Sequence, residues 1–114
     1  MSTTLVNLTP HAVTLVDSEG TVLAQFAPVA PAARCAVTSQ QVASVEVAGV
    51  QVPVYSSVMG EVQDLPAPEH GVLYIVSRIV AEACKGTRSD LLVPDKTVRN
   101  NDGQIVGCAG FAVV

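Results

Sequence analysis

Charged and amide side chains gather in one segment of the C-terminal third, and their types suit ligand binding. They are Arg88, Asp90, Asp95, Arg99, Asn100 and Asn101. Guanidinium groups recognise phosphate through paired, charge-assisted hydrogen bonds, while Asp and Asn bind ribose hydroxyls or base edges. The structural alternative is a surface ion pair, Arg88 with Asp90 or Arg99 with Asp95, beside an ordinary Asn-Asp-Gly turn. Both interpretations stay open on the sequence alone.

Positive charge is concentrated in the same part of the chain. Five of the six basic residues lie from Arg78 to Arg99, and the sixth is Arg34. Such clustering in an acidic protein is compatible with a small anion held by local contacts, but charge alone favours solvated charges on the surface of a small domain. The net charge of −4 argues against a nucleic-acid duplex as partner, because duplex binding depends on neutralising many phosphates.

Aromatic and nucleophilic side chains are few. Tyr74 and Phe111 are the candidates for a face on which a base could stack. His11 and His70 have no neighbour that makes a nucleophile–base pair by spacing, and no metal-ligand spacing is present. We therefore expect no catalytic residue, no metal and no cofactor, and a nucleotide hydrolase using His11 or Cys108 ranks behind the binding functions.

Composition indicates one domain, residues 1–114, with a core of small aliphatic side chains. About half of the residues are apolar, and there is no tryptophan. Abundant valine and alanine with few charges leave apolar surface to cover, so we expect a homo-oligomer. The sequence has neither the roughly 18 continuous apolar residues of a membrane helix nor the pattern of a signal peptide. Three cysteines suit a reducing cytosol, and the predicted location is cytoplasmic.

A strand followed directly by a short helix is predicted from residue 72 to 86. The β-branched and aromatic run 72–76 is typical of a buried strand, and Ser77 is a suitable N-cap for a helix over 78–84. Gly86 then supplies the left-handed residue that ends many helices.

Most of the remaining chain predicts antiparallel hairpins. Pro53 places its strand at an edge or a bulge, residues 58–71 are expected to be mainly loop, and Gly107 and Gly110 suggest a bulge. The predicted strands are 4–8, 11–17, 21–26, 34–38, 42–47, 50–57, 104–108 and 111–114, with 61–63 and 91–93 as shorter candidates. The predicted class is α+β: a mostly antiparallel, strongly curved sheet built from hairpins, with one or two short helices.

Several short motifs resemble a group of small bacteriophage and prophage proteins. They are Asn7-Leu8-Thr9-Pro10-His11, Ala33-Arg34, Gly60-Glu61-Val62 with Leu65-Pro66-Ala67-Pro68, Leu73–Ser77, Arg88-Ser89-Asp90 with Pro94, Arg99, and Gly103–Cys108. The group is similar to the Thoeris anti-defence sponge proteins, which phages use against bacterial immune signalling. The resemblance spans nearly the whole chain.

The resemblance implies a non-catalytic protein that sequesters cyclic ADP-ribose isomers between subunits of a homo-oligomer built of dimeric units. Some members are hexamers that also hold cyclic oligonucleotides. By the same resemblance, Arg34 and Arg99 would hold the pyrophosphate, and Tyr74 or Phe111 would stack on adenine. Asp90 or Asn100 would reach a ribose.

Two functions of different classes follow from the sequence. The leading hypothesis is capture of a cyclic nucleotide signal by binding without cleavage. The alternative is a small phage protein-interaction module, structural or inhibitory, whose apolar surface docks on a protein partner and which has no nucleotide ligand.

Overall fold

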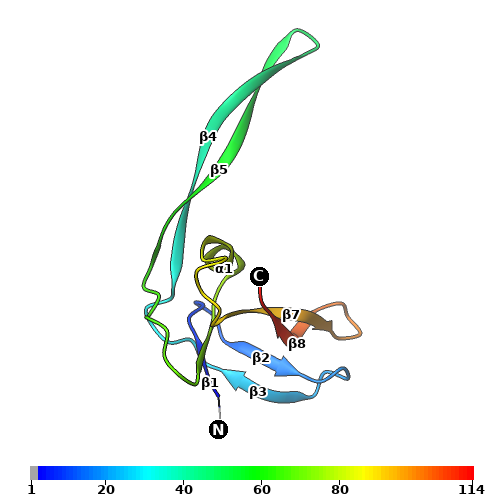
Figure 1. Cartoon of the computed structure of the whole chain (residues 1–114). Coiled ribbons are helices and arrows are strands. Elements are labelled where there is room, and N and C mark those ends of the chain that lie inside the picture. Colours follow the sequence, from blue (N-terminus) through cyan, green and yellow to red (C-terminus); the bar gives the residue numbers. More distant parts are fainter. Residues whose placement is uncertain (1–2) are drawn as a thin grey trace.

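The computed structural model describes residues 3–114, in which six strands form one curved sheet and two longer strands form a projecting hairpin (Figure 1). The strands of the sheet are β1 (Thr4–Asn7), β2 (Val13–Val16), β3 (Val22–Phe26), β6 (Val72–Ile75), β7 (Leu91–Arg99) and β8 (Ile105–Ala112). The projecting strands are β4 (Arg34–Val47) and β5 (Val50–Gln63). We call residues 34–63 the arm and the remaining described residues the body.

The sheet of the body has the order β1-β6-β7-β8-β2-β3 and is mixed. β2 with β3 and β7 with β8 are antiparallel, whereas β6 runs parallel to both β1 and β7. A backbone bond of 2.8 Å from Val29 N to Asn7 O brings the chain after β3 back beside β1. The two edges of the sheet therefore approach each other, which confirms the predicted strong curvature.

Asn7 fixes this closure with its buried side chain. Its Nδ2 donates to the carbonyls of His11 (2.8 Å) and Phe26 (2.9 Å), and its Oδ1 accepts from the Thr9 backbone N–H (2.9 Å). Only 1% of Asn7 is exposed, and a buried amide is tolerated because its polar atoms are bonded. One side chain thus joins β1, the turn after it and the end of β3.

The helix α1 (Arg78–Ala83) begins where the sequence predicts it. The Ser77 hydroxyl accepts from the Val80 N–H at 3.3 Å, as an N-cap does, and Gly86 follows the helix with a φ of 84°. Val80 and Ala81 are buried. The helix packs its apolar side on the body beside the base of the arm (Figure 1).

Two clusters of buried side chains make up the core. The larger lies under α1 and includes Tyr74, Val76, Val80 and Leu91. The smaller lies on the other face of β6, where Ile75 contacts Val13 and Cys108. Successive residues of β6 point to opposite faces, so this one strand contributes to both clusters. The core is aliphatic, as the composition predicts.

The arm differs from the sequence prediction in length. Strands predicted over 34–38 and 42–47 are one strand, β4. Residues 58–60, expected to be loop, and the short candidate strand 61–63 both continue β5. The short candidate strand 91–93 likewise extends to residue 99 as β7, and β8 is continuous over the predicted strands 104–108 and 111–114. The predicted bulge is present at Val106, next to Gly107.

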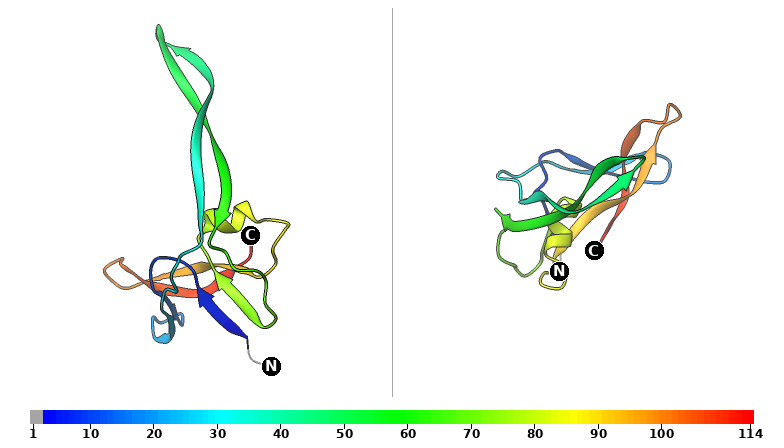
Figure 2. Two further views of the ribbon diagram at one scale, coloured as in Figure 1. Left: turned by 90° about the vertical axis from the view of Figure 1, so that its left-hand side faces the viewer. Right: turned by 90° about the horizontal axis from the view of Figure 1, so that it is seen from above.

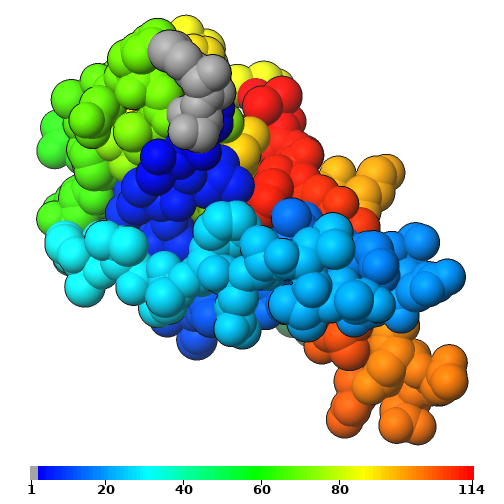
Figure 3. All heavy atoms as spheres, turned by 90° about the horizontal axis from the view of Figure 1, so that it is seen from below, coloured from blue at the N-terminus to red at the C-terminus, as the bar shows by residue number. Residues whose placement is uncertain are grey.

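The arm stands away from the body in Figure 1 and in the left view of Figure 2, and within residues 3–114 no other strand pairs with it. From the side opposite the arm, the segment between β2 and β4 crosses the surface of the body and the β7–β8 turn projects beyond it (Figure 3). Every residue from 36 to 61 is exposed. The described chain therefore combines a packed body with an uncovered two-stranded ribbon.

Candidate functional site

The distal half of the arm is a regular antiparallel ladder closed by a two-residue turn. The register pairs Val47 with Val50 and Val45 with Val52. Ala48 and Gly49 form the turn with φ values of 51° and 81°. Positive φ at both central positions is the geometry of a type I′ turn, whose twist matches the strands that it joins. The register of the arm is therefore fixed from its tip.

One face of this ladder consists of aliphatic side chains only. Residues paired directly across an antiparallel ladder point to the same face, and each strand alternates between faces. The face contains Ala43, Val45, Val47, Val50, Val52 and Val54, and we call it the valine face. Its five valines are between 39% and 61% exposed. An alternating pattern of this kind is typical of a strand with one face buried, yet all five valines of this face remain exposed in the described chain.

The opposite face is polar. It carries Ser44, Glu46 and Gln51 beside Pro53, and we call these four residues the polar face. The Ser44 hydroxyl lies 3.2 Å from Gln51 Oε1 and donates to it across the strands. Glu46 is the only charged residue between positions 35 and 60. The arm thus has one face suited to water and one suited to burial against another surface.

Two bulges separate the valine face from the body. Val42 is the extra residue where the register shifts between Gln41 and Ala43, and a second shift lies between Cys35 and Val37. Bulges increase the local twist of a ribbon. Below the second shift, Cys35 and Val62 pack against the main core. The base of the arm is therefore anchored to the body while the valine face stays free.

Arg34, predicted as a phosphate-binding residue, lies at the base of the arm. Its guanidinium contacts the Asp64 carboxylate at 3.4 Å, and the two side chains are 69% and 36% exposed. A long contact between exposed groups contributes little to stability. Arg34 is therefore a cation held loosely at the surface.

Arg88 and Asp90 form a half-buried ion pair, which is the structural alternative raised by the sequence. The Arg88 Nε and Nη2 atoms donate to the two oxygens of Asp90 at 2.9 and 2.8 Å, and Nη2 also donates to the Pro66 carbonyl at 2.8 Å. The hydrogen bonds from Arg88 lower the pKa of Asp90, against the opposing effect of burial. The pair ties the 64–71 loop to the start of β7.

The other predicted ligand residues lie elsewhere. Tyr74 is buried, and its hydroxyl is 3.5 Å from the Ala67 carbonyl. Phe111 packs edge to face on Phe26, with ring centroids 6.2 Å apart. Within one protomer, Tyr74 and Phe111 thus serve the packing of the body.

Arg99 and Asn100 belong to the β7–β8 turn. Arg99 donates to the Gly103 carbonyl at 2.8 Å, and Asn100 Oδ1 accepts from the N–H groups of Asp102 and Gln104. Both side chains are exposed and stabilise the turn. The predicted residues therefore occupy several separate places: the arm base, the loop before β7, the β7–β8 turn and the interior of the body.

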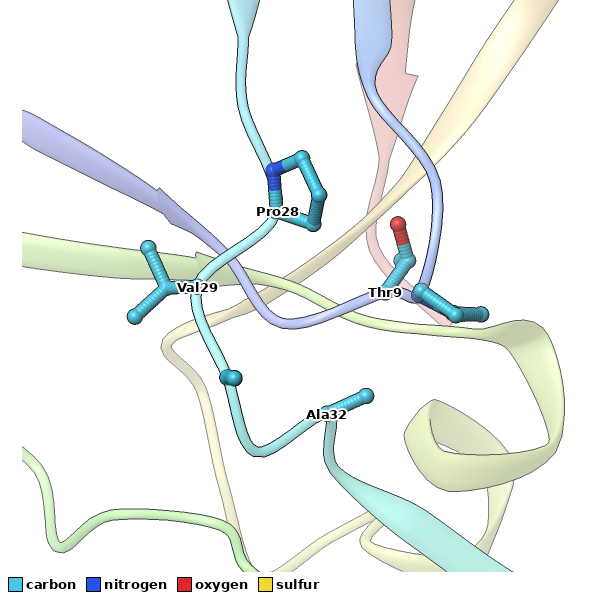
Figure 4. Close-up of a pocket in the computed structure, with 6 residues that line it drawn as sticks. Thr9, Pro28, Val29 and Ala32 are labelled. Carbon is cyan, nitrogen blue, oxygen red and sulfur yellow. The ribbon is translucent and has the colours of Figure 1, made fainter.

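A cavity of about 310 Å³ opens on the body between the β1–β2 turn and the segment after β3. Its lining residues are Thr9, Pro10, Pro28, Val29, Ala30 and Ala32. In Figure 4, Thr9 faces the cavity from one loop while Pro28 and Ala32 come from the other. The Thr9 hydroxyl is already bonded to Asn7 and to the His11 carbonyl. The lining is apolar and uncharged, so it does not suit a phosphate.

Within residues 3–114, no three side chains of the metal-ligating types come together, and no helix is long and apolar enough to span a membrane. In the described part of the chain, the valine face is an exposed apolar surface with a regular alternating pattern. Two features of the sequence indicate this face: valine at every second position over 50–54, and the Ala48-Gly49 turn.

No protein-family model, no curated protein and no solved structure matches this chain.

Proposed function

We propose that the chain is a non-catalytic protein-interaction module, whose arm docks on a protein partner through the valine face. The observation that carries the proposal is the unbroken aliphatic ladder of the valine face, with its five valines 39–61% exposed. Large exposed apolar patches mark interaction surfaces in folded proteins. The body then acts as the anchor that presents the arm.

The low stability expected of an uncovered two-stranded hairpin supports the same function. An isolated two-stranded hairpin is at best marginally stable in water, and stable sheets of this size gain a third strand or a packed face. Each strand of the arm has 14 residues, and only its base packs against α1 and the core. A partner surface that covers the valine face would supply the missing apolar burial.

Site-specific photo-crosslinking in cells tests the proposal. A benzophenone side chain is placed at Val52 on the valine face or at Gln51, the adjacent residue on the polar face. We expect protein adducts from position 52 at a yield several-fold above position 51. Equal yields, or no protein adduct at position 52, would contradict docking through this face.

Capture of a cyclic nucleotide is the second candidate, and the position of Arg34 favours it. This guanidinium is 69% exposed, its one ion pair is long, and it lies at the base of a projecting arm. An anion bound there would gain a charge-assisted contact at little cost in existing bonds.

The thermal midpoint of unfolding measures this second function, because a ligand bound only by the folded state raises it by mass action. The panel contains cyclic ADP-ribose isomers and cyclic oligonucleotides. If the second function holds, one member raises the midpoint of the wild type, and Arg34→Ala reduces that shift. The matched variant Arg78→Ala removes an equally exposed arginine on α1, and we expect it to show the same shift in midpoint as the wild type.

A further inference from the structure

We infer that the partner of the valine face is a second copy of this chain, bound with valine face against valine face. The inference rests on the proposed docking function and names its partner. The four strands of two arms would form a small β-sandwich, with the polar faces outward. Two such layers pack about 10 Å apart, with their inward side chains interdigitated.

The accessible surface of the chain is too large for a monomer of this mass. The structure exposes 7680 Å², whereas a folded monomer of 11.8 kDa exposes about 5,900 Å². The excess is about 1,800 Å² per chain, roughly twice the 800 Å² that each partner contributes to a standard interface. A dimer through the arms therefore has enough surface available.

The dimensions of the chain show the same excess. Its radius of gyration is 18.1 Å, while a compact domain of 114 residues is expected near 13 Å. The longest extent is 60 Å against a shortest extent of 23 Å. The arm accounts for this elongation, since it projects from the body in Figure 1 and in the left view of Figure 2.

The charge distribution permits self-association at the valine face. In a two-fold dimer the same patch meets itself, so any charge in the patch would face its own sign. The chain carries a net charge of −4, yet the valine face contains no charged or polar side chain. Glu46, the nearest charge in the sequence, points to the opposite side of the ribbon. The valine face is thus complementary to a copy of itself.

The composition of the face also favours a copy over an unrelated partner. Interfaces between different, separately folded proteins are about as polar as ordinary surface, whereas homodimer interfaces are more apolar. Six consecutive aliphatic positions of the ladder, without a polar member, resemble the interior of a β-sandwich. We therefore assign the valine face to a permanent contact between copies.

Sedimentation of the purified full chain tests the inference with matched variants. Val45→Thr combined with Val52→Thr places four hydroxyls in the proposed interface and keeps β-branched side chains. Ser44→Thr combined with Gln51→Thr changes the adjacent residues on the polar face. Far-UV circular dichroism and thermal unfolding report whether the body of each variant remains folded.

We expect the wild type and the polar-face variant to sediment as dimers. The valine-face variant is expected to have a dissociation constant raised at least about 100-fold, because each hydroxyl is buried without a partner. A wild type that stays monomeric, or an oligomer indifferent to the valine-face substitutions, would overturn the inference.

The crosslinking experiment separates this inference from the proposed docking function. An adduct at position 52 with the mass of two copies of the chain supports both. An adduct with a different protein, together with a monomeric purified chain, overturns the inference and leaves docking intact. The absence of any adduct overturns the docking function itself.

Discussion

Val45 and Val52 lie directly opposite each other on the arm, with 48% and 40% of their surfaces exposed. In a sheet such a pair normally helps to fill a core, because paired β-branched side chains pack well on a covered face. Here the register pairs the two side chains directly across the strands, but in the single chain nothing covers them. The body can be tested independently of the interaction proposed for the arm.

Val80→Ala should destabilise the body by about 1–3 kcal/mol. Val80 lies on the buried side of α1 and is fully buried, so its truncation leaves a cavity. Ile79→Ala is the matched control one position earlier on the same helix, where the side chain is 46% exposed. Its effect should stay below about 1 kcal/mol. Urea unfolding measures both variants, and equal losses would show that α1 is packed differently.

Gly107→Ala should disrupt the contact between β2 and β8. An added Cβ would lie 2.6 Å from the Thr14 carbonyl oxygen and 2.9 Å from a methyl group of Val16, so the backbone must shift. We expect a loss of about 1–3 kcal/mol in the free energy of unfolding. Gly110→Ala, on the same strand, meets nothing within 4 Å and should change stability by less than about 0.5 kcal/mol.

Arg88→Ala should cost about 3 kcal/mol near neutral pH, since it leaves the half-buried Asp90 carboxylate without its partner. Arg78→Ala breaks the exposed contact with Glu82 and should cost no more than about 0.5 kcal/mol. Chemical denaturation gives both values. Similar losses in the two variants would contradict a structural role for the Arg88–Asp90 pair.

The same pair predicts a pH dependence of stability. The hydrogen bonds of Arg88 lower the pKa of Asp90 below the usual 3.8, so the stabilisation is complete above that value. It is lost as the pH falls below 3.8 and through the lower pKa of the folded state. The difference in unfolding free energy between wild type and Arg88→Ala should therefore narrow below pH 3.8. A constant difference from pH 7 to pH 3 would contradict the assignment.

Asn7→Ala should be among the most damaging single changes in the body. It removes a buried side chain whose amide bonds two carbonyls and the backbone N–H of Thr9, leaving these groups without their partner. We expect a loss of at least about 3 kcal/mol. Gln25→Ala, which removes an exposed 3.2 Å bond to Thr14, serves as the control in thermal unfolding. A mild effect at Asn7 would mean that the sheet closes without it.

The sequence predicts the body well where local signals are strong. Ser77 and Gly86 bracket the helix, and the first three strands are placed within a few residues, because caps and tight turns act over short distances. The mixed order of the sheet is not predictable in this way. It depends on which distant strands pair, and no local sequence signal indicates that β6 lies between β1 and β7.

The sequence pattern predicts an arm shorter than the one in the structure, and the difference has a physical reason. Gly60, beside Met59, resembles a strand breaker, and Ser56-Ser57 interrupts the alternation of valine. In the structure, Gly60 lies within a strand at a register shift, beside the Ala36 carbonyl of the partner strand. A glycine inside a strand pattern can therefore mark a bulge as well as an end.

The charged and amide ligand candidates from Arg88 to Asn101 share one sequence segment but not one place in the fold. Arg88 and Asp90 are neighbours because they flank one residue, while Arg99 and Asn100 lie at the far end of a nine-residue strand. Residues close in sequence separate by more than 3 Å per position once they enter a strand. Linear clustering of charge thus did not predict a single site.

The arm leaves and re-enters the body at adjacent points, since Arg34 pairs with Gln63. A ribbon with such closely spaced ends can change length without altering the fold that supports it. Removing two residues from each strand would shorten the arm by about 7 Å and leave the valine face on the same side. Removing one residue from each strand would move the valine face to the opposite side of the arm. Related chains should therefore vary the length of the arm in steps of two paired positions, each step changing how far the Ala48-Gly49 turn lies from the body.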